Sequence, residues 1–584
     1  MTHHWKVRPK VPDEIVERFP EIDPILLQLL YSRGLNEQDS IDEFLEPDFS
    51  RDMHDPFLFR DMRATVSRIE KAIRDKEKTV IYGDYDADGV CATAVLSETI
   101  AALGGSVDVY IPFRETEGYG LNVRAVEELH TKGTRLIITV DCGTTNVREV
   151  ARASELGMDV IITDHHDEPL ELPKSYVIVN PELTGQGYPY HHLSGAGVAF
   201  KVATALLQHT SYGAKLGSAV LSVGWEKWLL DIVAISTVTD MVPMLGENRV
   251  IVRYGLAVLK KTKRIGLREL IGRIRTQIED IDEETLGFQI GPRLNAAGRM
   301  NHASSAYRLL MTRDAKEASK LAEDLSSQNT ERQRLTDATF KEALEQIGDT
   351  PAAHLVFAIG TTWAPGIIGL VAGKLVERYN RPAIVFIKSG PRYIGSGRSI
   401  DAFDITKALG SVAQLLDRYG GHPQACGFTL KNKSKPNIVG EQLVSIADKQ
   451  LRGVDLTPVI DVDAEVVLDD VNWKLVEDVQ RLAPFGEDAE QPRFLSRGLR
   501  VVAVDTVGKD SQHLRLHVSH ATSEVKKTIG FRFGSWIQSI RPGDSIDCIF
   551  EVGMNEWNGE REIELKIVDL DHSGSNQHGK EALG

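Results

Sequence analysis

Cysteine is scarce in this sequence, and the few cysteines present are scattered. The 584 residues include four, Cys91, Cys142, Cys426 and Cys548, and none forms a C-x-x-C pair. Disulfide-linked secreted domains and zinc modules both need cysteines at short, paired spacings. The sequence therefore favours buried thiols in a reducing cytoplasm.

Long hydrophobic runs are also missing. The longest candidate, Leu229 to Val238, is interrupted by Asp231 and by two hydroxyl residues, whereas a membrane span needs about 18 apolar residues. The first residues, Met-Thr-His-His-Trp-Lys, lack the apolar stretch of a secretion signal. We therefore expect a soluble, cytoplasmic protein.

Positive charge is in deficit, because the formal net charge is −16. Phosphate binding usually favours a basic surface, which argues against a nucleic-acid partner. However, a carboxylate-rich metal site adds negative charge that bound divalent ions cancel, and a few arginines in one groove can outweigh the overall sum. Net charge alone therefore does not decide the partner.

Composition and length predict an ordinary globular protein with about three or four domains, since 42% of residues are hydrophobic and 26% charged. A compositional pass along the chain gives the expected boundaries. They are an N-terminal segment (1–60), an α/β domain (61–300), a connecting helix (301–350), a second α/β domain (351–452), a β-barrel (455–571) and a disordered tail (572–584).

The first α/β domain begins with apolar, strand-like runs that alternate with amphipathic helical segments. Continuous apolar strands predict a doubly wound parallel sheet covered by helices on both faces. Ligands bind such sheets at the carboxyl ends of the strands. The expected strands are Thr79–Tyr82, Val107–Ile111, Leu136–Val140, Val160–Thr163 and Val177–Val179.

The second half of the chain changes pattern twice. Ala318, Leu321 and Leu325 keep helical spacing, and a polar insert, Ser326 to Arg334, then interrupts the apolar stripe. This predicts a long exposed helix between two lobes. A smaller α/β unit follows from about Leu355, and beyond it short strands separated by Gly, Asn and Asp predict a closed β-barrel.

Three carboxylates, Asp84, Asp86 and Asp88, directly follow the first strand. Carboxylates this close repel one another and persist where cations hold them. A calcium loop or a polar strand-to-helix turn is the alternative, although the glutamate that ends an EF-hand loop is missing.

Matching groups follow later elements. Asp141 and the Asp164-His165-His166 run each end a predicted strand, and Asp240 follows a predicted helix. The carboxyl ends of parallel strands meet at one edge, so these side chains should converge there. Carboxylate and imidazole donors suit Mn²⁺ or Mg²⁺, whereas a lone His-His pair would more often be a structural turn.

The order of these motifs is similar to that of the DHH phosphoesterases, and their longer contexts resemble the RecJ family of bacterial 5′-to-3′ single-strand exonucleases. The resemblance extends from about residue 5 to about residue 570. Each motif alone is modest, and their joint order is specific. The matching contexts are 114–121, 193–197, 291–299, 329–333, 395–399, 420–423 and 484–486.

The resemblance implies a DHH domain, a DHHA1 domain and an OB-like barrel, with two Mn²⁺ or Mg²⁺ ions. Asp141 would bridge the ions. Asp86, helped by Asp84, would hold one of them. The other would be held by Asp88, His165 and Asp240.

Two further residues acquire roles from the same resemblance. Asp164 would orient the His165 side chain without binding the metal itself, while His166 would contact the scissile phosphate. Together with Asp141 they form the expected catalytic set.

Substrate-binding residues are implied as well. Arg114, Ser396 and Arg398 match positions around the 5′-terminal phosphate. Further candidates for backbone contacts are Arg293, Arg299 and His422, for which ion pairs between lobes or a capped turn are the alternative. In the barrel, Phe531, Phe533, Trp536 and Trp557 are candidate base-stacking residues or core residues.

The implied function is single-stranded DNA degradation from the 5′ end to 5′-mononucleotides, in recombination and repair. The expected protein is a monomer that works with a single-strand binding protein and a helicase. Two departures from the family pattern stand out: Tyr82 replaces a common histidine, which predicts a weaker first ion site, and Ala364 replaces a polar residue.

Three other interpretations stay open. They are an enzyme for short oligonucleotides, cyclic dinucleotides or pyrophosphate, an inactive scaffold, and a DNA-binding protein without activity. The C-terminal barrel favours a polymer substrate, and the retained ligand residues favour an enzyme.

Overall fold

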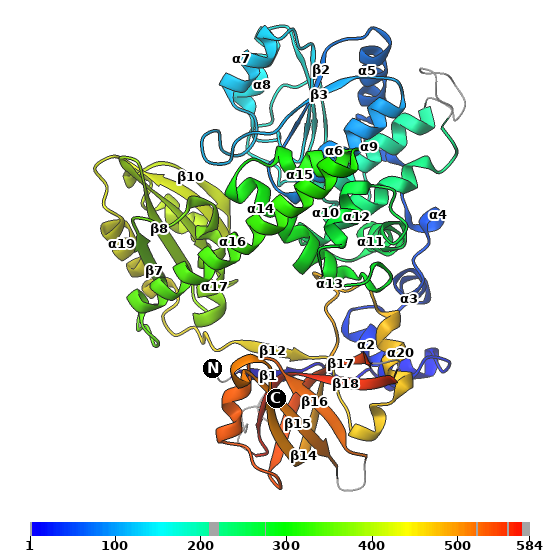
Figure 1. Ribbon diagram of the computed structural model, residues 1–584, viewed down its shortest axis with the longest axis vertical. Helices are drawn as coiled ribbons and strands as arrows, with labels where there is room; N and C mark the ends of the chain where they lie inside the picture. The colour runs from blue at the N-terminus through cyan, green and yellow to red at the C-terminus, as the bar shows by residue number, and fades with distance from the viewer. Residues whose placement is uncertain (1–2, 210–220, 275, 521–523, 558–559, 575–584) are drawn as a thin grey trace. The chain divides into compact units, whose positions relative to one another are not determined.

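The structure is a computed structural model that describes residues 3–209, 221–274, 276–520, 524–557 and 560–574 (Figure 1). The chain divides into two units. The smaller unit comprises residues 1–48, 243–249 and 457–584, and the larger unit comprises residues 49–242 and 250–456. No helix among the described residues is both long enough and apolar enough to cross a bilayer.

The larger unit begins with a five-stranded sheet in which every neighbouring pair is parallel. The strand order is β3-β2-β4-β5-β6. The strands are β2 (Thr79–Gly83), β3 (Val107–Tyr110), β4 (Leu136–Val140), β5 (Asp159–Thr163) and β6 (Val177–Val179).

Helices cover both faces of this sheet, which explains its continuous apolar strands (Figure 1). Val80, Ile137 and Val160 pack in one cluster with residues of α7 (Val123–Thr131) and α8 (Val147–Glu155). The helices α6 (Ala87–Ala102) and α9 (Gly195–His209) pack together and contact sheet strands. The prediction of a doubly wound α/β sheet is confirmed.

The strand order places a topological switch point between β2 and β4. The chain leaves β2 toward β3 on one side and returns to β4 on the other. Ligands bind doubly wound sheets at such a point, outside the carboxyl ends of the strands. The turn that carries Asp84 to Asp88 follows β2, and Asp141 follows β4, so both lie at this edge.

The long helix α16 (Ala315–Ile347) lies within the segment expected as the connecting helix (301–350), which also contains the separate helix α15 (Ser304–Met311). Asp314 caps the first turn of α16 by accepting a hydrogen bond from the backbone N–H of Glu317. Its N-terminal half packs against α12 (Ile265–Ile271) and α14 (Gly291–Met300), and its C-terminal half packs against α17 (Ile368–Tyr379) and β7 (Val356–Gly360). The helix therefore contributes to two lobes within one unit.

The second lobe is built on a mixed five-stranded sheet with the order β10-β11-β9-β8-β7. The helix α17 packs on one face, while α18 (Ile405–Gly410) and α19 (Pro436–Gln450) contribute to the core on the other. The remaining strands are β8 (Ala383–Ser389), β9 (Arg392–Arg398), β10 (Leu416–His422) and β11 (Ala425–Leu430).

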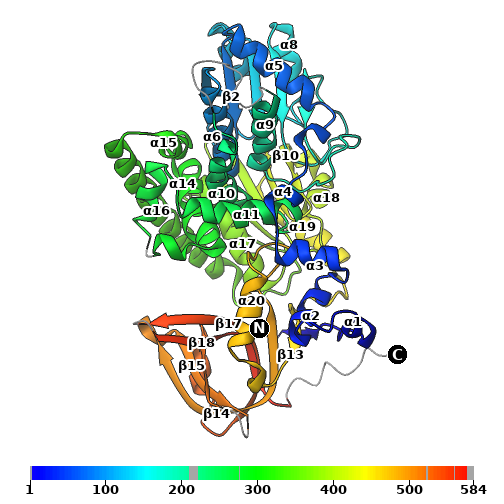
Figure 2. The ribbon, with the colours of Figure 1, turned by 90° about the vertical axis from the view of Figure 1, so that its right-hand side faces the viewer.

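In the smaller unit, five strands close into a barrel, because β14 pairs with both β15 and β17 (Figure 2). This confirms the OB-like prediction. Phe531 is 54% exposed, whereas the side chain of Trp557 lies outside the described residues. The barrel strands are β14 (Arg493–Val507), β15 (His513–Ser519), β16 (Lys526–Gly530), β17 (Ser545–Trp557) and β18 (Glu560–His572).

The N-terminal segment belongs to the same unit as the barrel. β1 (His4–Val7) pairs in parallel with β12 (Val459–Val462). The buried guanidinium of Arg249 donates to the carbonyl oxygens of Phe44, Leu482 and Pro484, joining three distant segments. The tail expected at 572–584 lies mostly outside the described residues, and His572 still belongs to β18.

Candidate metal centre and arginine cluster

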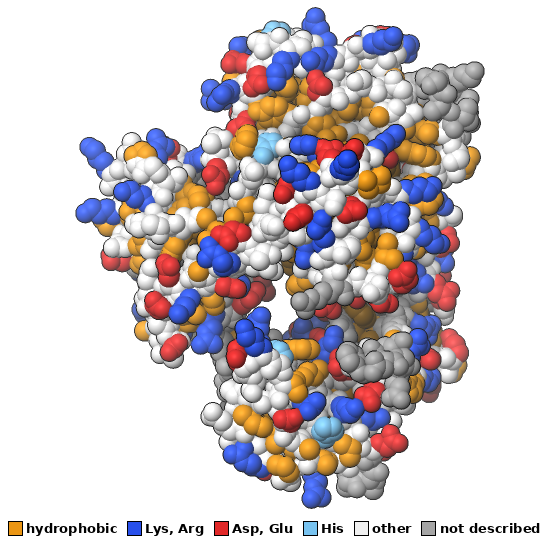
Figure 3. All heavy atoms as spheres, viewed as in Figure 1, with side chains coloured by type: hydrophobic (Ala, Val, Ile, Leu, Met, Phe, Trp, Pro, Cys, Tyr) orange, Lys and Arg blue, Asp and Glu red, His pale blue; other side chains and the backbone are white. Residues whose placement is uncertain are grey.

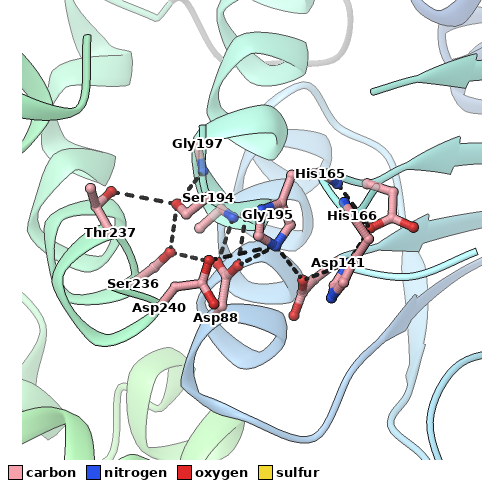
Figure 4. A network of polar contacts seen from close by, with 12 residues as sticks. Asp88, Asp141, His165, His166, Ser194, Gly195, Gly197, Ser236, Thr237 and Asp240 are labelled. Carbon is pink, nitrogen blue, oxygen red and sulfur yellow. Dashed lines mark hydrogen bonds and ion pairs between the residues drawn. The ribbon is translucent and has the colours of Figure 1, made fainter. Parts of the chain in front are cut away.

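Asp88, in the first turn of α6, is held by two other elements (Figure 4). Its carboxylate accepts hydrogen bonds from the backbone N–H groups of Gly195 (2.6 Å) and Ala196 (2.7 Å) at the start of α9. The hydroxyl of Ser236, in α10 (Leu230–Thr239), donates a third bond at 2.5 Å. These donors fix the carboxylate group in one orientation.

Three carboxylates converge on the ring of His165. Its Nε2 lies 3.1 Å from Asp141 Oδ1, 3.5 Å from Asp88 Oδ2 and 3.5 Å from Asp240 Oδ2. One imidazole nitrogen donates at most one proton, so this nitrogen alone does not satisfy three carboxylate oxygens. This donor set suits a divalent cation.

A second cluster shares Asp141. Ligand oxygens of Asp84, Asp86 and Asp141 all lie within 4.8 Å of one another, as do ligand atoms of Asp88, His165 and Asp240. Asp141 has a left-handed backbone (φ 58°) at the end of β4, which directs its side chain differently from a residue that continues the strand. The structure therefore brings together all six residues expected to bind metal.

The buried oxygens of this site fit two cations. Asp84 Oδ1 and Asp240 Oδ2 are buried and accept no hydrogen bond, and an unsatisfied buried carboxylate is costly. Burial, followed by the charge of neighbouring carboxylates, raises the pKa of Asp84, Asp141 and Asp240 well above the ordinary carboxyl value. Bound cations would stabilise the ionised forms.

Asp164 contacts a different histidine from the one expected. Its Oδ1 lies 2.8 Å from Nδ1 of His166, and it meets His165 only through the backbone N–H. Although burial opposes it, the hydrogen bond to Asp164 raises the pKa of His166 to about 9. The expectation that Asp164 orients the His165 ring is therefore corrected: the ring beside Asp164 is that of His166.

Tyr119 is a site residue that we did not predict, although it lies within a matching motif. Its hydroxyl donates to the backbone oxygen of Asp141 at 3.2 Å and lies 3.1 Å from Nδ1 of His166. The motif marked the segment, but residue order gave no indication of where the ring points.

Tyr82, the departure from the family pattern, points into the core. It is fully buried, donates to the backbone oxygen of Gly120 at 3.0 Å, and stacks on Tyr110 with ring centroids 5.0 Å apart. The ligand oxygens of Asp84 and Asp86 converge with Asp141 without it. A weaker first ion site stays a prediction.

Four guanidinium groups gather beside the metal ligands. Burial, followed by the charges of Arg114, Arg332 and Arg398, lowers the pKa of Arg299 to about 9, and Asp86 is near enough to oppose this shift. Within the described ranges, none of the four forms an ion pair with a carboxylate. We call Arg114, Arg299, Arg332 and Arg398 the arginine cluster.

This local grouping contrasts with the wider surface. On the face seen in Figure 3, basic and acidic side chains are interspersed. The net charge of −16 therefore coexists with a local concentration of arginines. Anion binding at this site therefore depends on the local arginines more than on the overall charge.

Ser396 and Arg398 lie on β9 against the first turn of α17. A Cβ on Gly369, in that turn, would stand 3.2 Å from Ser396 Oγ and 3.1 Å from Arg398 Nη2. The missing side chain leaves room beside both groups. Arginine, hydroxyl and helix N-terminal N–H groups together favour a phosphate.

The other two candidates differ in position. His422, on β10, lies 3.1 Å from Asp167 Oδ2, and its ring centroid is 6.4 Å from that of His166. The second lobe thus reaches the loop that carries His165 and His166, and the distance between His422 and Asp167 is that of an ion pair, which was the alternative considered. Arg293 donates to the backbone oxygen of Gln289, and its Nε is buried without a partner.

Three family models match the chain. They are the DHH family N-terminal domain at residues 78–237, the DHHA1 domain at 351–451 and the RecJ OB domain at 462–569.

Relatives that match most of this chain belong to the same family. The single-stranded-DNA-specific exonuclease RecJ of Bacillus subtilis (strain 168) is 38% identical over 572 residues, covering 97% of this chain and 70% of that protein. The RecJ of Thermus thermophilus is 32% identical, covering 87% of this chain and 71% of that protein.

Solved structures give the same result. A crystal structure of RecJ from Thermus thermophilus in complex with Mn²⁺ matches with a TM-score of 0.82 and 28% identity, covering 97% of this chain and 79% of that chain. A crystal structure of exonuclease RecJ bound to manganese matches with a TM-score of 0.59 and 33% identity, covering 68% of this chain and 98% of that chain. The fold, the motif order and the level of identity show that this chain belongs to the RecJ family.

Proposed function

We propose that the protein is a metal-dependent exonuclease specific for single-stranded DNA, which degrades its substrate from the 5′ end and acts in recombination and repair. The observation that carries the proposal is the pair of ligand clusters that meet at Asp141, with buried carboxylate oxygens that lack a hydrogen-bond partner and that bound cations would satisfy. The name and metal content of the relatives support the same activity.

Two Mn²⁺ or Mg²⁺ ions would lower the pKa of a bound water and stabilise the leaving oxygen of an in-line displacement at phosphorus. Asp84 and Asp86 would hold one ion. Asp88, His165 and Asp240 would hold the other, with Asp141 between them. The product is a 5′-mononucleotide.

His166 and Asp164 act on the substrate rather than on the ions. With its pKa raised to about 9, the His166 ring carries a proton at neutral pH and can donate to a phosphoryl oxygen. Asp164 holds that ring through Nδ1 at 2.8 Å, and Nε2, which lies 3.4 Å from the Tyr119 hydroxyl, would donate to the substrate.

The second lobe, which carries Ser396 and Arg398, would set the 5′-to-3′ direction of degradation. Arg114, Ser396 and Arg398 would bind the 5′-terminal phosphate beside the N-terminus of α17. Anchoring that phosphate next to the metal ligands places the first phosphodiester at the reaction centre. Arg293, Arg299 and His422 would contact the following backbone.

The remaining expectations form part of this proposal. The catalytic DHH domain spans 61–300, the connecting helix 301–350, the DHHA1 domain 351–452 and the OB-like domain 455–571, after an N-terminal segment of 1–60. The protein is a monomer in the cytoplasm, where its DNA substrate lies, and works with a single-strand binding protein and a helicase.

The test uses single strands labelled at either end, with Mn²⁺, comparing the wild type with Asp141→Ala. We expect 5′-labelled mononucleotides first from the wild type and none from the variant. Asp349→Asn, which alters a carboxylate whose side chain is 99% exposed in the same unit, is the matched control and should keep full activity. Mononucleotides from Asp141→Ala, or label released first from the 3′ end, would contradict the proposal.

A further inference from the structure

The polar insert of α16 contains a buried amide. Apolar residues of this helix are buried on either side of it, including Leu325 and Ala343, yet the polar Asn329 is only 3% exposed. Buried amides need hydrogen-bond partners. Asn329 Oδ1 accepts a hydrogen bond from Arg332 Nε, one turn later, at 3.1 Å.

This contact fixes the guanidinium of Arg332 without using its outer nitrogens. Within the residues that the structure describes, the side chain of Arg332 hydrogen-bonds only to Asn329 on the same helix. An arginine that tied the two lobes together would instead donate to another element. The half-buried guanidinium therefore has no bonded partner on another element of the described chain, and the carboxylate near enough to act on its charge, Asp337, lies on the same helix and is paired with Lys374.

Arg332 is the member of the arginine cluster that lies on α16. The helices α14 and α16 pack together, and Arg332 is close enough to Arg299, at the end of α14, for their charges to interact. Like charges held together in a partly buried site are unfavourable without an anion. A single terminal phosphate carries at most about two negative charges, so Arg114 and Arg398 suffice for it, and two guanidinium groups remain.

We propose that Arg332 binds a backbone phosphate of the substrate strand beside Arg299, and that Asn329 is its positioning residue. The inference rests on the proposed function, because it requires a polyanionic strand in this site. Arg332 thus extends phosphate binding from the second lobe onto the connecting helix.

The chain offers a matched control on the same helix. Arg334 lies two residues further on, and its guanidinium is mostly exposed and donates two hydrogen bonds to Glu331, each at 2.7 Å. Arg334→Gln removes the same charge from the same helix. Because Arg334 already has a carboxylate partner, its loss should not affect phosphate binding.

The experiment measures kcat and KM on single strands at several salt concentrations. We expect Arg332→Gln to raise KM about tenfold with a smaller change in kcat, and to reduce the slope of log KM against log salt by about 0.7, the loss of one phosphate contact. Arg334→Gln should change neither quantity. Arg332→Lys keeps the charge and should keep the salt slope, while losing the bond to Asn329 and raising KM.

Positioning is tested with a double-mutant cycle. Asn329→Ala should raise KM, and adding it to Arg332→Gln should raise KM no further, since both remove one contact. The inference would be overturned if the effects of Asn329→Ala and Arg332→Gln on KM were additive. It would also be overturned if Arg332→Gln and Arg334→Gln gave the same salt slope. In either case, an active wild type leaves the proposed function intact. A wild type that does not degrade single strands would overturn the proposed function instead. Arg332→Lys and the melting temperatures separate a folding defect from lost binding.

Discussion

At the scale of single residues, protons and metal ions compete for the same carboxylates. Burial and mutual repulsion raise the pKa of Asp84, Asp141 and Asp240, so the metal-free site retains protons that the ionised ligands must release. Metal binding should therefore release protons and tighten as pH rises.

The raised carboxyl pKa values also determine how the stability of the metal-free protein changes with pH. A folded state with raised carboxyl pKa values binds more protons than the unfolded chain, so metal-free stability falls as pH rises above the ordinary carboxyl pKa of about 4. Mn²⁺ should offset this loss. We expect the Mn²⁺-induced rise in melting temperature to grow from about pH 6 to about pH 8 in thermal scans, and a gain independent of pH would count against the account.

Gly195 permits the close packing of two ligand residues. A Cβ at this position would lie 2.6 Å from Asp141 Cβ and 2.8 Å from Asp88 Oδ2. Gly195→Ala should displace both carboxylates and lower kcat/KM by on the order of 100-fold. Gly197→Ala, where the nearest atom would lie 3.3 Å away, is the control. Equal activity of the two variants would show that the glycine is not needed for this packing.

Which residues converge was predictable, but their pairwise contacts were not. Strand ends in a parallel sheet meet at one edge, so Asp88, Asp141 and His165 were expected together. Adjacent histidines direct their rings according to local backbone geometry, and this is why Asp164 meets His166 and why Tyr119 was missed.

At the scale of elements, apolar patterning predicted the buried parallel strands and α16 closely, because both depend on local periodicity. It did not predict that β1 pairs with β12. A four-residue strand carries no signal that identifies a partner far along the chain. Pairings of this kind depend on tertiary packing.

The strand β9 should set the preference for a 5′ phosphate. It carries Arg398 at its end, against the first turn of α17, and Arg392 at its start, paired with Asp417. Arg398→Gln should lower the kcat/KM ratio between 5′-phosphorylated and 5′-hydroxyl strands about tenfold, whereas Arg392→Gln should leave it unchanged. A ratio unaffected by Arg398→Gln would place the phosphate elsewhere.

At the scale of the whole molecule, linear domain boundaries described the chain incompletely. The order of domains was predictable from the changes in pattern. However, residues 1–48 and 243–249 group with the C-terminal barrel rather than with their sequence neighbours. Linear composition does not indicate that a chain returns to an earlier unit.

A substitution at Arg249 can test whether these separate segments form one unit. Its buried guanidinium joins Phe44 to Leu482 and Pro484 within the smaller unit. Arg249→Met leaves those carbonyl oxygens unsatisfied and should cost about 3–5 kcal/mol of that unit's stability. Calorimetry should show this as a lowered transition that Mn²⁺ does not restore. Arg500→Met, an exposed arginine on β14, is the control, and equal transitions in the two variants would contradict the role.

The proposed centre holds two divalent ions that share Asp141, although its acidic residues are far apart in the sequence. Anomalous diffraction from crystals grown with Mn²⁺ tests it most directly. We predict two peaks, one beside Asp84 and Asp86 and the other beside Asp88, His165 and Asp240, both in contact with Asp141. A single peak, or peaks that do not share Asp141, would contradict the account.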